Sequence, residues 1–352
     1  MTAIRIDCSA TGLPSHAVRI LPSRDLEAEL PAMYAVAEAC RGADGEIERG
    51  TLAGMLAYYR TLERFDPSQD VVLARIGERI VGYARVQSVD SNDGERWYEA
   101  TCHVHPDARR RGLGRRMLAW AETRRQLMAV ADTEAGRATG RPRWLTTFVH
   151  DGDVGGAALL DAAGYEPFRR FHSMRRPGFH DIPDLPLPEG LEVRPIHDEP
   201  AAIRAVVAAD TEAFRDHFGA PDDPESVYSQ IVEDPDTDVA LWVVAFDGDE
   251  IAGGVLNGIH LDHGGVPVGW LDSVFTRRQW RRRGLARALV ARSLRLLRNR
   301  GLGSAALGVD STNPNQALHL YQSCGFEVAS SSTAWRKPLP AGERAAVPET
   351  IG

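Results

Sequence analysis

The sequence Val274-Phe275-Thr276-Arg277-Arg278-Gln279-Trp280-Arg281-Arg282-Arg283-Gly284-Leu285-Ala286 joins a β-rich run to a long amphipathic helical pattern. A helix start has backbone N–H groups without intrahelical partners, and its dipole places about half a positive charge there. Glycine allows the backbone to approach a ligand closely, and neighbouring arginines can add charge-assisted hydrogen bonds to phosphate oxygens. The loop from Arg281 to Ala286 is therefore predicted to bind a diphosphate.

A second copy of this R-x-x-G-x-[GA] pattern runs from Arg109 to Gly114, after the β-rich run that ends in Cys102-His103-Val104-His105. In each half a strand-like run, an alanine-rich helical segment and two β-rich runs precede the loop. The helical segments are 24–41 and 199–215, and the β-rich runs are joined by the hairpin signals Gly77-Glu78 and Asp247-Gly248-Asp249. This repeated order predicts a duplicated domain. One large α/β domain with coincidental symmetry is the alternative.

Length and composition agree with two globular domains. The chain has 352 residues, of which 43% are hydrophobic and 26% are charged, so each half can bury a core. A proline-rich stretch, 177–189, is predicted to be an extended linker, because its prolines remove backbone donors and restrict the preceding residues. We expect an N-terminal domain over 16–176, a C-terminal domain over 190–337 and a flexible tail over 338–352.

The charge balance and the cysteines argue against several classes of protein. The net charge is −8, so the chain as a whole lacks the basic field of a nucleic-acid binder. The sequence contains no run of 18 apolar residues, so we expect no membrane span, and we expect no signal peptide. The four cysteines form no CxxC pair, which fits a reducing cytoplasm. His103 and His105 share a strand face without an evident third ligand, so we expect no metal site.

The most specific motif lies near the C-terminus. It reads Asn313-Pro314-Asn315-Gln316-Ala317-Leu318-His319-Leu320-Tyr321-Gln322-Ser323-Cys324-Gly325-Phe326, or N-x-x-A-x-x-x-Y-x-x-x-G-F. This pattern resembles motif B of the GNAT (GCN5-related N-acetyltransferase) superfamily, and the two arginine-glycine loops resemble its motif A. The resemblance covers about 18–176 and 190–337. It implies an α/β (α+β) protein of two tandem GNAT folds, each a mixed, mostly antiparallel twisted sheet flanked by helices.

The resemblance also implies acetyl-CoA as cosubstrate. The backbone of Val274, Phe275 and Thr276 would pair with the pantetheine arm, and Asn313 would cap its helix or bond that arm. The pyrophosphate would lie in the loop formed by Arg281, Arg282, Arg283, Gly284, Leu285 and Ala286. The matching cofactor residues of the first half would be Val104, Arg109, Gly112 and Gly114.

Tyr321 takes the place of the superfamily's usual general acid, which protonates the CoA thiolate as the thioester is cleaved. Its alternative role is that of a half-buried helix aromatic. Counting back from Gly164-Tyr165 places Leu160 at the position of Tyr321 and Gly152 at that of Asn313. A leucine cannot protonate a thiolate, so we expect the first domain to keep the fold and to have lost the standard chemistry.

A base is needed because an alkylamine has a pKa near ~10 and is almost wholly protonated at neutral pH. Asp272 is the first candidate; it lies two residues after Trp270, which occupies the superfamily's commonest glutamate position. Asp310 is the second candidate, and either residue could instead be an ordinary surface or turn carboxylate. Phe214, Asp216 and His217 could line an acceptor pocket or simply end a helix, where the dipole favours a histidine.

The predicted activity is acetyl-CoA-dependent acylation of a primary amine on a small molecule. The tandem arrangement with the better-preserved second motif is similar to that of superfamily members that acetylate a cysteinyl pseudodisaccharide. An antibiotic amine remains a possible acceptor. The alternatives are a protein or peptide N-terminal acetyltransferase and a non-catalytic acyl-CoA sensor. We expect a cytoplasmic monomer or homodimer with no nucleic-acid or membrane partner.

Overall fold

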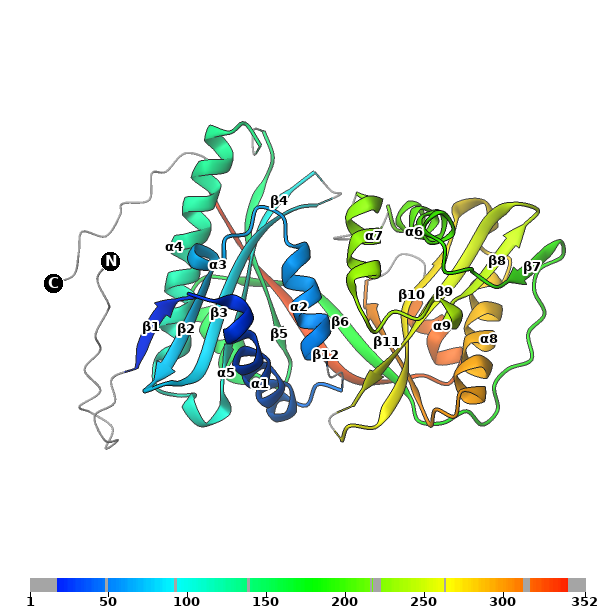
Figure 1. Cartoon of the computed structure of the whole chain (residues 1–352), viewed down its shortest axis with the longest axis horizontal. Helices are drawn as coiled ribbons and strands as arrows, with labels where there is room; N and C mark the ends of the chain where they lie inside the picture. The colour runs from blue at the N-terminus through cyan, green and yellow to red at the C-terminus, as the bar shows by residue number, and fades with distance from the viewer. Residues whose placement is uncertain are drawn as a thin grey trace. The chain divides into compact units, whose positions relative to one another are not determined.

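The computed structural model describes residues 18–340, except for 48–49, 92–93, 138–139, 216, 218–222, 263 and 313–316 (Figure 1). The chain divides into two compact units. The first unit comprises Met1–Asp44, Leu62–Phe168 and Thr333–Gly352, and the second comprises Gly45–Thr61 and Arg169–Ser332. The predicted duplication is therefore present as two α/β units. Each unit is built mainly from one half of the sequence and also contains segments of the other half.

The sheet of the first unit contains five strands in chain order followed by the end of the last strand of the chain. These are β1 (Arg19–Pro22), β2 (Val71–Ile76), β3 (Arg79–Asp90), β4 (Arg96–Val104), β5 (Arg143–His150) and the second half of β12 (Glu327–Pro338). β1 to β4 pair antiparallel, whereas β4 and β5 pair parallel. The predicted hairpin at Gly77-Glu78 joins β2 and β3.

Helices α1 (Leu26–Asp44) and α4 (Leu113–Glu134) both pack against β3 and β4 of the first unit. Met117 of α4 closes a cluster with Val72, Val81 and Leu113, which buries the apolar face of the sheet. Two shorter helices, α3 (Pro67–Asp70) and α5 (Val154–Ala162), complete this unit together with the 3₁₀ turn Pro106–Ala108.

The second unit repeats this arrangement. Its strands are β7 (Leu191–Arg194), β8 (Val243–Asp247), β9 (Glu250–Leu261), β10 (Pro267–Thr276) and β11 (Ala305–Asp310), followed by β6 (Glu166–Arg176). β10 and β11 are parallel, and β6 pairs antiparallel with β11 from Arg176↔Ala305 to Phe171↔Asp310. The predicted hairpin at Asp247-Gly248-Asp249 joins β8 and β9, and Val239–Leu241 forms a 3₁₀ turn shortly before β8.

Helices cover both faces of this second sheet. Its helices are α6 (Pro200–Phe214), α7 (Pro224–Glu233), α8 (Leu285–Asn299) and α9 (Ala317–Ser323). Val243 packs in the hydrophobic cluster that contains residues of α8, whereas its neighbour Val244 packs in the cluster that contains residues of α6. Since consecutive strand residues point to opposite faces, α6 and α8 lie on opposite sides of the sheet. The site described below uses both sides.

The two halves of the sequence exchange strands, and this could not be predicted from the order of elements along the chain. The last strand of each half, β6 or β12, contributes residues to the unit built mainly from the other half. Helix α2 (Leu52–Thr61) of the N-terminal half also belongs to the second unit, where it packs on α7. Thr51 donates to Asp236 at 2.7 Å beside it.

The predicted linker, 177–189, runs along α8 in the second unit. Arg292 donates to the Leu185 carbonyl at 2.9 Å, and Arg295 donates to the Pro183 carbonyl at 2.8 Å. Of the predicted tail, residues 338–340 are described, and Leu339 donates its N–H to Arg143 at 2.9 Å in the first unit; 341–352 lie outside the described residues. No described helix is both long enough and apolar enough to cross a membrane.

Candidate active site

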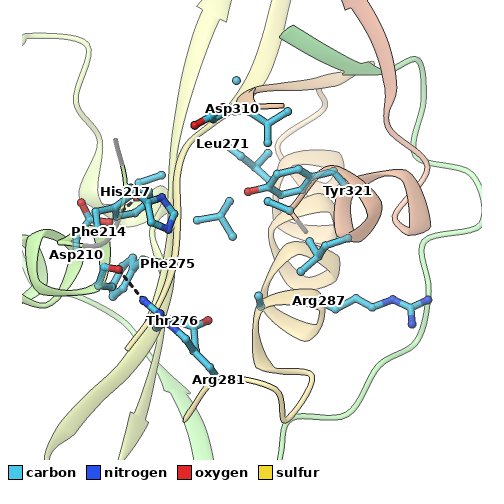
Figure 2. Close-up of a pocket in the computed structure, with 18 of the residues that line it drawn as sticks. Asp210, Phe214, His217, Leu271, Phe275, Thr276, Arg281, Arg287, Asp310 and Tyr321 are labelled. Carbon is cyan, nitrogen blue, oxygen red and sulfur yellow. Dashed lines mark hydrogen bonds between the residues drawn. The ribbon is translucent and has the colours of Figure 1, made fainter. Parts of the chain in front are cut away.

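A cavity of about 1040 Å³ lies within the second unit (Figure 2). Its walls come from the end of β10, the loop that starts α8, the helix α9, the end of α6 and the strand β6. In Figure 2, Asp210, Phe214 and His217 lie on one side of β10, and Tyr321 lies on the other. The cavity therefore reaches both faces of the sheet.

The cavity opens because two parallel strands separate. β10 and β11 pair only at Gly269↔Ala305 and Trp270↔Ala306, and beyond these positions β10 is paired on its other edge, with β9. Val274, Phe275 and Thr276 line the cavity, as do Gly308 and Val309 of β11. The backbone groups on the facing edge of β10 are thus available to an extended ligand, and the pairing of these three residues with the pantetheine arm stays a prediction.

A β-bulge shapes this part of β10. The pairing with β9 shifts by one residue between Leu271 and Ser273, so that Asp272 is the extra residue. A bulge leaves one residue unpaired and redirects its neighbours. As a result Ser273 turns toward α6, where its hydroxyl donates to the Asp210 carboxylate at 2.5 Å.

The loop before α8 presents backbone amides to the cavity. Arg282 and Gly284 have φ values of 63° and 82°, in the left-handed region, and Gly284 is the N-cap of α8 without a side-chain hydrogen bond to the helix. Gly284, Leu285 and Ala286 line the cavity. Uncapped N–H groups at a helix start, next to Arg282, form the kind of anion site that a pyrophosphate fits.

Arg281 has a different set of partners from the one the motif suggested. Its Nε donates to the Thr276 carbonyl at 3.0 Å, and its second terminal nitrogen donates to the Ala213 carbonyl at 2.8 Å. The side chain thereby ties the end of β10 to the end of α6, although it also lines the cavity. Contact of Arg281 with a phosphate stays a prediction, as does that of the exposed Arg283.

Thr276 provides a test of whether the cavity suits a polar ligand. Its Oγ1 is buried and has no hydrogen-bond partner among the described residues, although Thr276 lines the cavity. A buried hydroxyl without a partner is costly, and an amide-bearing arm along β10 would supply the missing bond. The residues present therefore fit acetyl-CoA.

Tyr321 lies on α9 and is 7% exposed. Its ring packs edge-on against Phe326, with centroids 6.2 Å apart, and Figure 2 shows its hydroxyl turned toward β10. Burial raises the pKa of this phenol above its ordinary value, so the proton is retained at neutral pH. The geometry suits a proton donor. Asn313, which should open this helix, lies outside the described residues.

The two carboxylates predicted as bases both line the cavity but have partners. The Asp272 carboxylate shares a hydrogen bond of 3.0 Å with His260 Nε2, and its side chain is 43% exposed. Asp310 forms an ion pair of 2.8 Å with Arg169 of β6 and also accepts from the Thr312 N–H. Trp270, at the usual glutamate position, is 7% exposed, and its ring lies at a tilt against that of His260 with centroids 5.5 Å apart.

Two of the three predicted acceptor residues lie together at the cavity wall. Phe214 and His217 both line it, with ring centroids 4.5 Å apart in an edge-on arrangement. Asp216, between them, lies outside the described residues. The aromatic pair forms a surface on the α6 side of the cavity, where Figure 2 shows the two rings next to each other.

The sequence did not single out Asp210 or the strand β6 as parts of the site. Asp210 lies on α6, and burial raises its pKa to about 6. Phe171, His172 and Ser173 of β6 also line the cavity, and His172 shares a hydrogen bond of 2.8 Å with Ser331. Asp210 belongs to no recognisable motif, because it is a single aspartate in an alanine-rich helix. The position of β6 beside β11 could not be predicted, because β6 comes from the N-terminal half of the sequence.

The equivalent residues of the first unit are engaged by that unit itself. Arg109 donates to the Val104 carbonyl at 3.1 Å and forms a two-point ion pair with Asp44. Gly112 is the left-handed N-cap of α4, and an added Cβ at Gly114 would meet Leu159 at 3.4 Å. Leu160, which takes the position of Tyr321 when the two halves are aligned, is buried in the core of the first unit.

No group of three possible metal ligands occurs among the residues that the structure describes. His103 packs against Tyr83, and burial lowers its pKa to about 4. His105 accepts the Asp107 N–H at 3.3 Å and so caps a short 3₁₀ turn. Both histidines thus have local roles in the first unit.

The sequence matches a family model described as the Acetyltransferase (GNAT) family, over residues 31–136 and 203–326. It is 31% identical over 311 residues to the mycothiol acetyltransferase of Thermobispora bispora, covering 86% of this chain and 94% of the relative. It is also 31% identical to that of Thermobifida fusca, covering 87% and 94%.

Two solved structures share the fold over nearly the whole chain. A GCN5-related N-acetyltransferase from Sphaerobacter thermophilus aligns with a TM-score of 0.66 and 25% identity, covering 94% of this chain and 98% of that one. A tandem GNAT protein from the clavulanic acid biosynthesis pathway aligns with a TM-score of 0.64 and 18% identity, covering 93% and 100%. The predicted pair of tandem folds is therefore confirmed.

Proposed function

The chain belongs to the GNAT acetyltransferase family, and we propose that its second unit transfers the acetyl group of acetyl-CoA to a primary amine of a small molecule. The observation that carries this proposal is the cavity in which Tyr321 and the unpaired edge of β10 face the uncapped start of α8. These are the three elements that thioester cleavage requires: a proton donor, a backbone platform and an anion site.

Each group has one task in the proposed reaction. Gly284, Leu285 and Ala286 hold the pyrophosphate, and Val274 to Thr276 align the arm so that the thioester lies near the gap between β10 and β11. The free amine attacks the thioester carbonyl carbon, and the carbon–sulfur bond then breaks. Tyr321 donates its proton to the leaving sulfur, so that CoA departs as a thiol, and the proton that the nitrogen loses as the amide forms restores the phenol. Asn313 is proposed to bond the arm as well.

A base must first remove a proton from the ammonium form of the acceptor. Asp272 is the base predicted from the sequence, and it lines the cavity beside the β-bulge. Its partner His260 is 30% exposed, which offers a route by which a proton can reach solvent. Asp310 is the weaker candidate because Arg169 neutralises it. Asp210 is a further carboxylate of the cavity, considered below.

The acceptor is proposed to be a small molecule because the relatives named above carry mycothiol acetyltransferase as their name. A cysteinyl pseudodisaccharide is the first choice, and Phe214 and His217 are proposed to contact it together with Asp216. The first unit is proposed to be catalytically inactive, because Leu160 stands where Tyr321 acts in the second.

The proposal is tested by offering acetyl-CoA with single amines and following CoA release and the acetylated product by mass spectrometry. The panel contains the cysteinyl pseudodisaccharide, kanamycin, spermidine and a short peptide with a free N-terminus. Turnover of the pseudodisaccharide above the others is expected. Preference for the peptide would support N-terminal acetylation instead, and tight acetyl-CoA binding without turnover of any amine would support a sensor.

A further inference from the structure

The carboxyl group of Asp210 lines the α6 side of the cavity (Figure 2). It accepts a hydrogen bond of 2.5 Å from Ser273, which the β-bulge has turned toward α6. Burial raises the pKa of Asp210 to about 6, and the hydrogen bond from Ser273 works against that increase. A carboxylate in this state is ionised at pH 7 and still accepts protons readily.

Charged groups on α6 itself and on β10, which packs against it, have partners of their own. On α6 itself, Glu212 is paired with Arg277 at 2.8 Å. On β10, Asp272 is held by His260. Arg281 donates to the carbonyls of Thr276 and Ala213.

The charged groups on α7 and the histidine that follows α6 do not neutralise the negative charge of Asp210 either. On α7, which packs against α6, Glu225 is paired with Arg204 at 3.0 Å. His217 follows α6 and packs on Phe214. No ion pair of Asp210 occurs among the described residues, so the carboxylate presents an uncompensated charge to whatever enters the cavity.

The first unit provides an internal comparison. The buried residues Leu30, Met33 and Cys40 of α1 recur with the same spacing in α6 as Ile203, Val206 and Ala213. This register places the buried Ala37 opposite Asp210. The first unit therefore lacks the carboxylate as well as the tyrosine, and its β3 and β4 pair in continuous register without a bulge. Asp210, the bulge and Tyr321 occur together in the unit that can catalyse.

The structure points to Asp210 as the residue that accepts the proton of the acceptor's ammonium group. The inference rests on the proposed function and names its base. The N–H bond of the ammonium breaks, the proton joins the Asp210 carboxylate, and the nitrogen lone pair attacks the thioester carbonyl. As the carbon–sulfur bond breaks, Tyr321 protonates the departing sulfur. The nitrogen loses its second proton as the amide forms, and this proton restores the Tyr321 phenol, while Asp210 later returns its proton to solvent. Trp270, buried at the usual glutamate position, cannot take this part.

The inference also specifies the chemical class of acceptor. A carboxylate without a counter-cation attracts an amine that arrives protonated, so the acceptor is an alkylammonium ion rather than an aniline or an amide. Ser273 is a positioning residue, because it fixes the carboxylate and adjusts its proton affinity through one hydrogen bond.

The test compares the wild-type protein with Asp210→Asn, Ser273→Ala and Asp272→Asn, using the best amine of the panel above. For each protein, kcat/KM is measured from pH 5 to pH 9, and acetyl-CoA affinity is measured by calorimetry. We expect Asp210→Asn to lower kcat about 100-fold, to leave acetyl-CoA affinity unchanged and to remove the fall in kcat/KM below about pH 6.

Ser273→Ala gives the readout that a purely structural role would not produce. Because loss of its hydrogen bond removes an influence that lowers the pKa of Asp210, the acidic limb should move to higher pH. Asp272→Asn should retain the acidic limb. Loss of that limb in Asp272→Asn, or its persistence in Asp210→Asn, overturns the inference. A wild-type protein that acetylates no amine refutes the proposed function instead, so the two failures are distinguishable.

Discussion

Arg109 and Asp44 form a two-point ion pair in the first unit, with nitrogen–oxygen distances of 2.6 and 2.7 Å. Asp44 ends α1, and an added Cβ at Gly152, in the loop that follows β5, would overlap the Asp44 carbonyl. The end of α1 thus spans from the arginine-glycine loop to the start of α5. In the second unit, the corresponding end of α6 and the end of β11 line the cavity, with His217 and Asp310 respectively.

We therefore predict that each chain binds one acetyl-CoA. In the first unit the Asp44 carboxylate is paired with the guanidinium of Arg109, and the Asp44 backbone carbonyl packs against Gly152. We expect these contacts to exclude a ligand from the first unit. Isothermal titration with acetyl-CoA should give a stoichiometry of one per chain. Two sites of similar affinity would show that the end of α1 moves aside, and Asp44→Ala is the variant in which a second site is expected to appear.

Replacement of Tyr321 by phenylalanine should lower kcat by about 100-fold or more, because the leaving thiolate loses its proton donor. Phenylalanine keeps the ring that packs on Phe326, so acetyl-CoA affinity and Tm should change little. Stopped-flow or steady-state CoA release measures the first quantity and calorimetry the second. An unchanged kcat would remove Tyr321 from the mechanism.

Gly284→Val should weaken acetyl-CoA binding at least tenfold. Gly284 has a φ of 82° and opens onto the cavity; a β-branched residue is strained there and carries its side chain into the anion site. Gly112→Val is a matched control, since Gly112 has a φ of 75° and, like Gly284, nothing within 4 Å of an added Cβ. Equal loss of binding in both variants would point to a folding defect rather than to a lost contact.

Asp210→Asn should make the protein more stable at pH 8. The folded-state pKa of about 6 exceeds the ordinary value of 3.8, so the ionised carboxylate costs the folded state free energy above about pH 6. That cost, about 1–3 kcal/mol, disappears as the pH falls through 6 toward 4, where the folded protein binds the proton first. Asparagine never carries the charge.

Thermal unfolding measured at pH 8 and at pH 4 checks this expectation. The Tm of Asp210→Asn should exceed that of the wild type by a few degrees at pH 8, and the difference should shrink at pH 4. A variant that is less stable than the wild type at pH 8 would mean that the Asp210 carboxylate is stabilised by its surroundings rather than strained by them.

Local patterns were sufficient to predict the first long helix of each half and both hairpins. The helices predicted over 24–41 and 199–215 are α1 and α6, and both hairpins occur at their Gly-containing turns. These features depend on residues close in sequence: helical periodicity, turn residues and glycines with positive φ. The arginine-glycine loops also have matching conformations, since Arg110 and Arg282 have φ values of 64° and 63°.

The site was only partly predictable for the same reason. Tyr321 and the residues Val274 to Thr276 belong to contiguous motifs, and they line one cavity. The extra residue in β10 was not predicted, because a bulge depends on the pairing with β9 rather than on β10 alone. Without that bulge in view, Ser273 and its hydrogen bond to Asp210 could not be anticipated.

The sequence by itself determined the order of elements, the duplication and the family, since each is encoded in residues that are neighbours along the chain. Only the tertiary structure decided that β6 pairs with β11, that Asp44 holds Arg109 and that Asp210 reaches the cavity. These arrangements join residues far apart in sequence, and they depend on which surfaces bury each other as the chain folds. No local pattern records that choice, because the free energy that selects it comes from packing and desolvation across the whole unit.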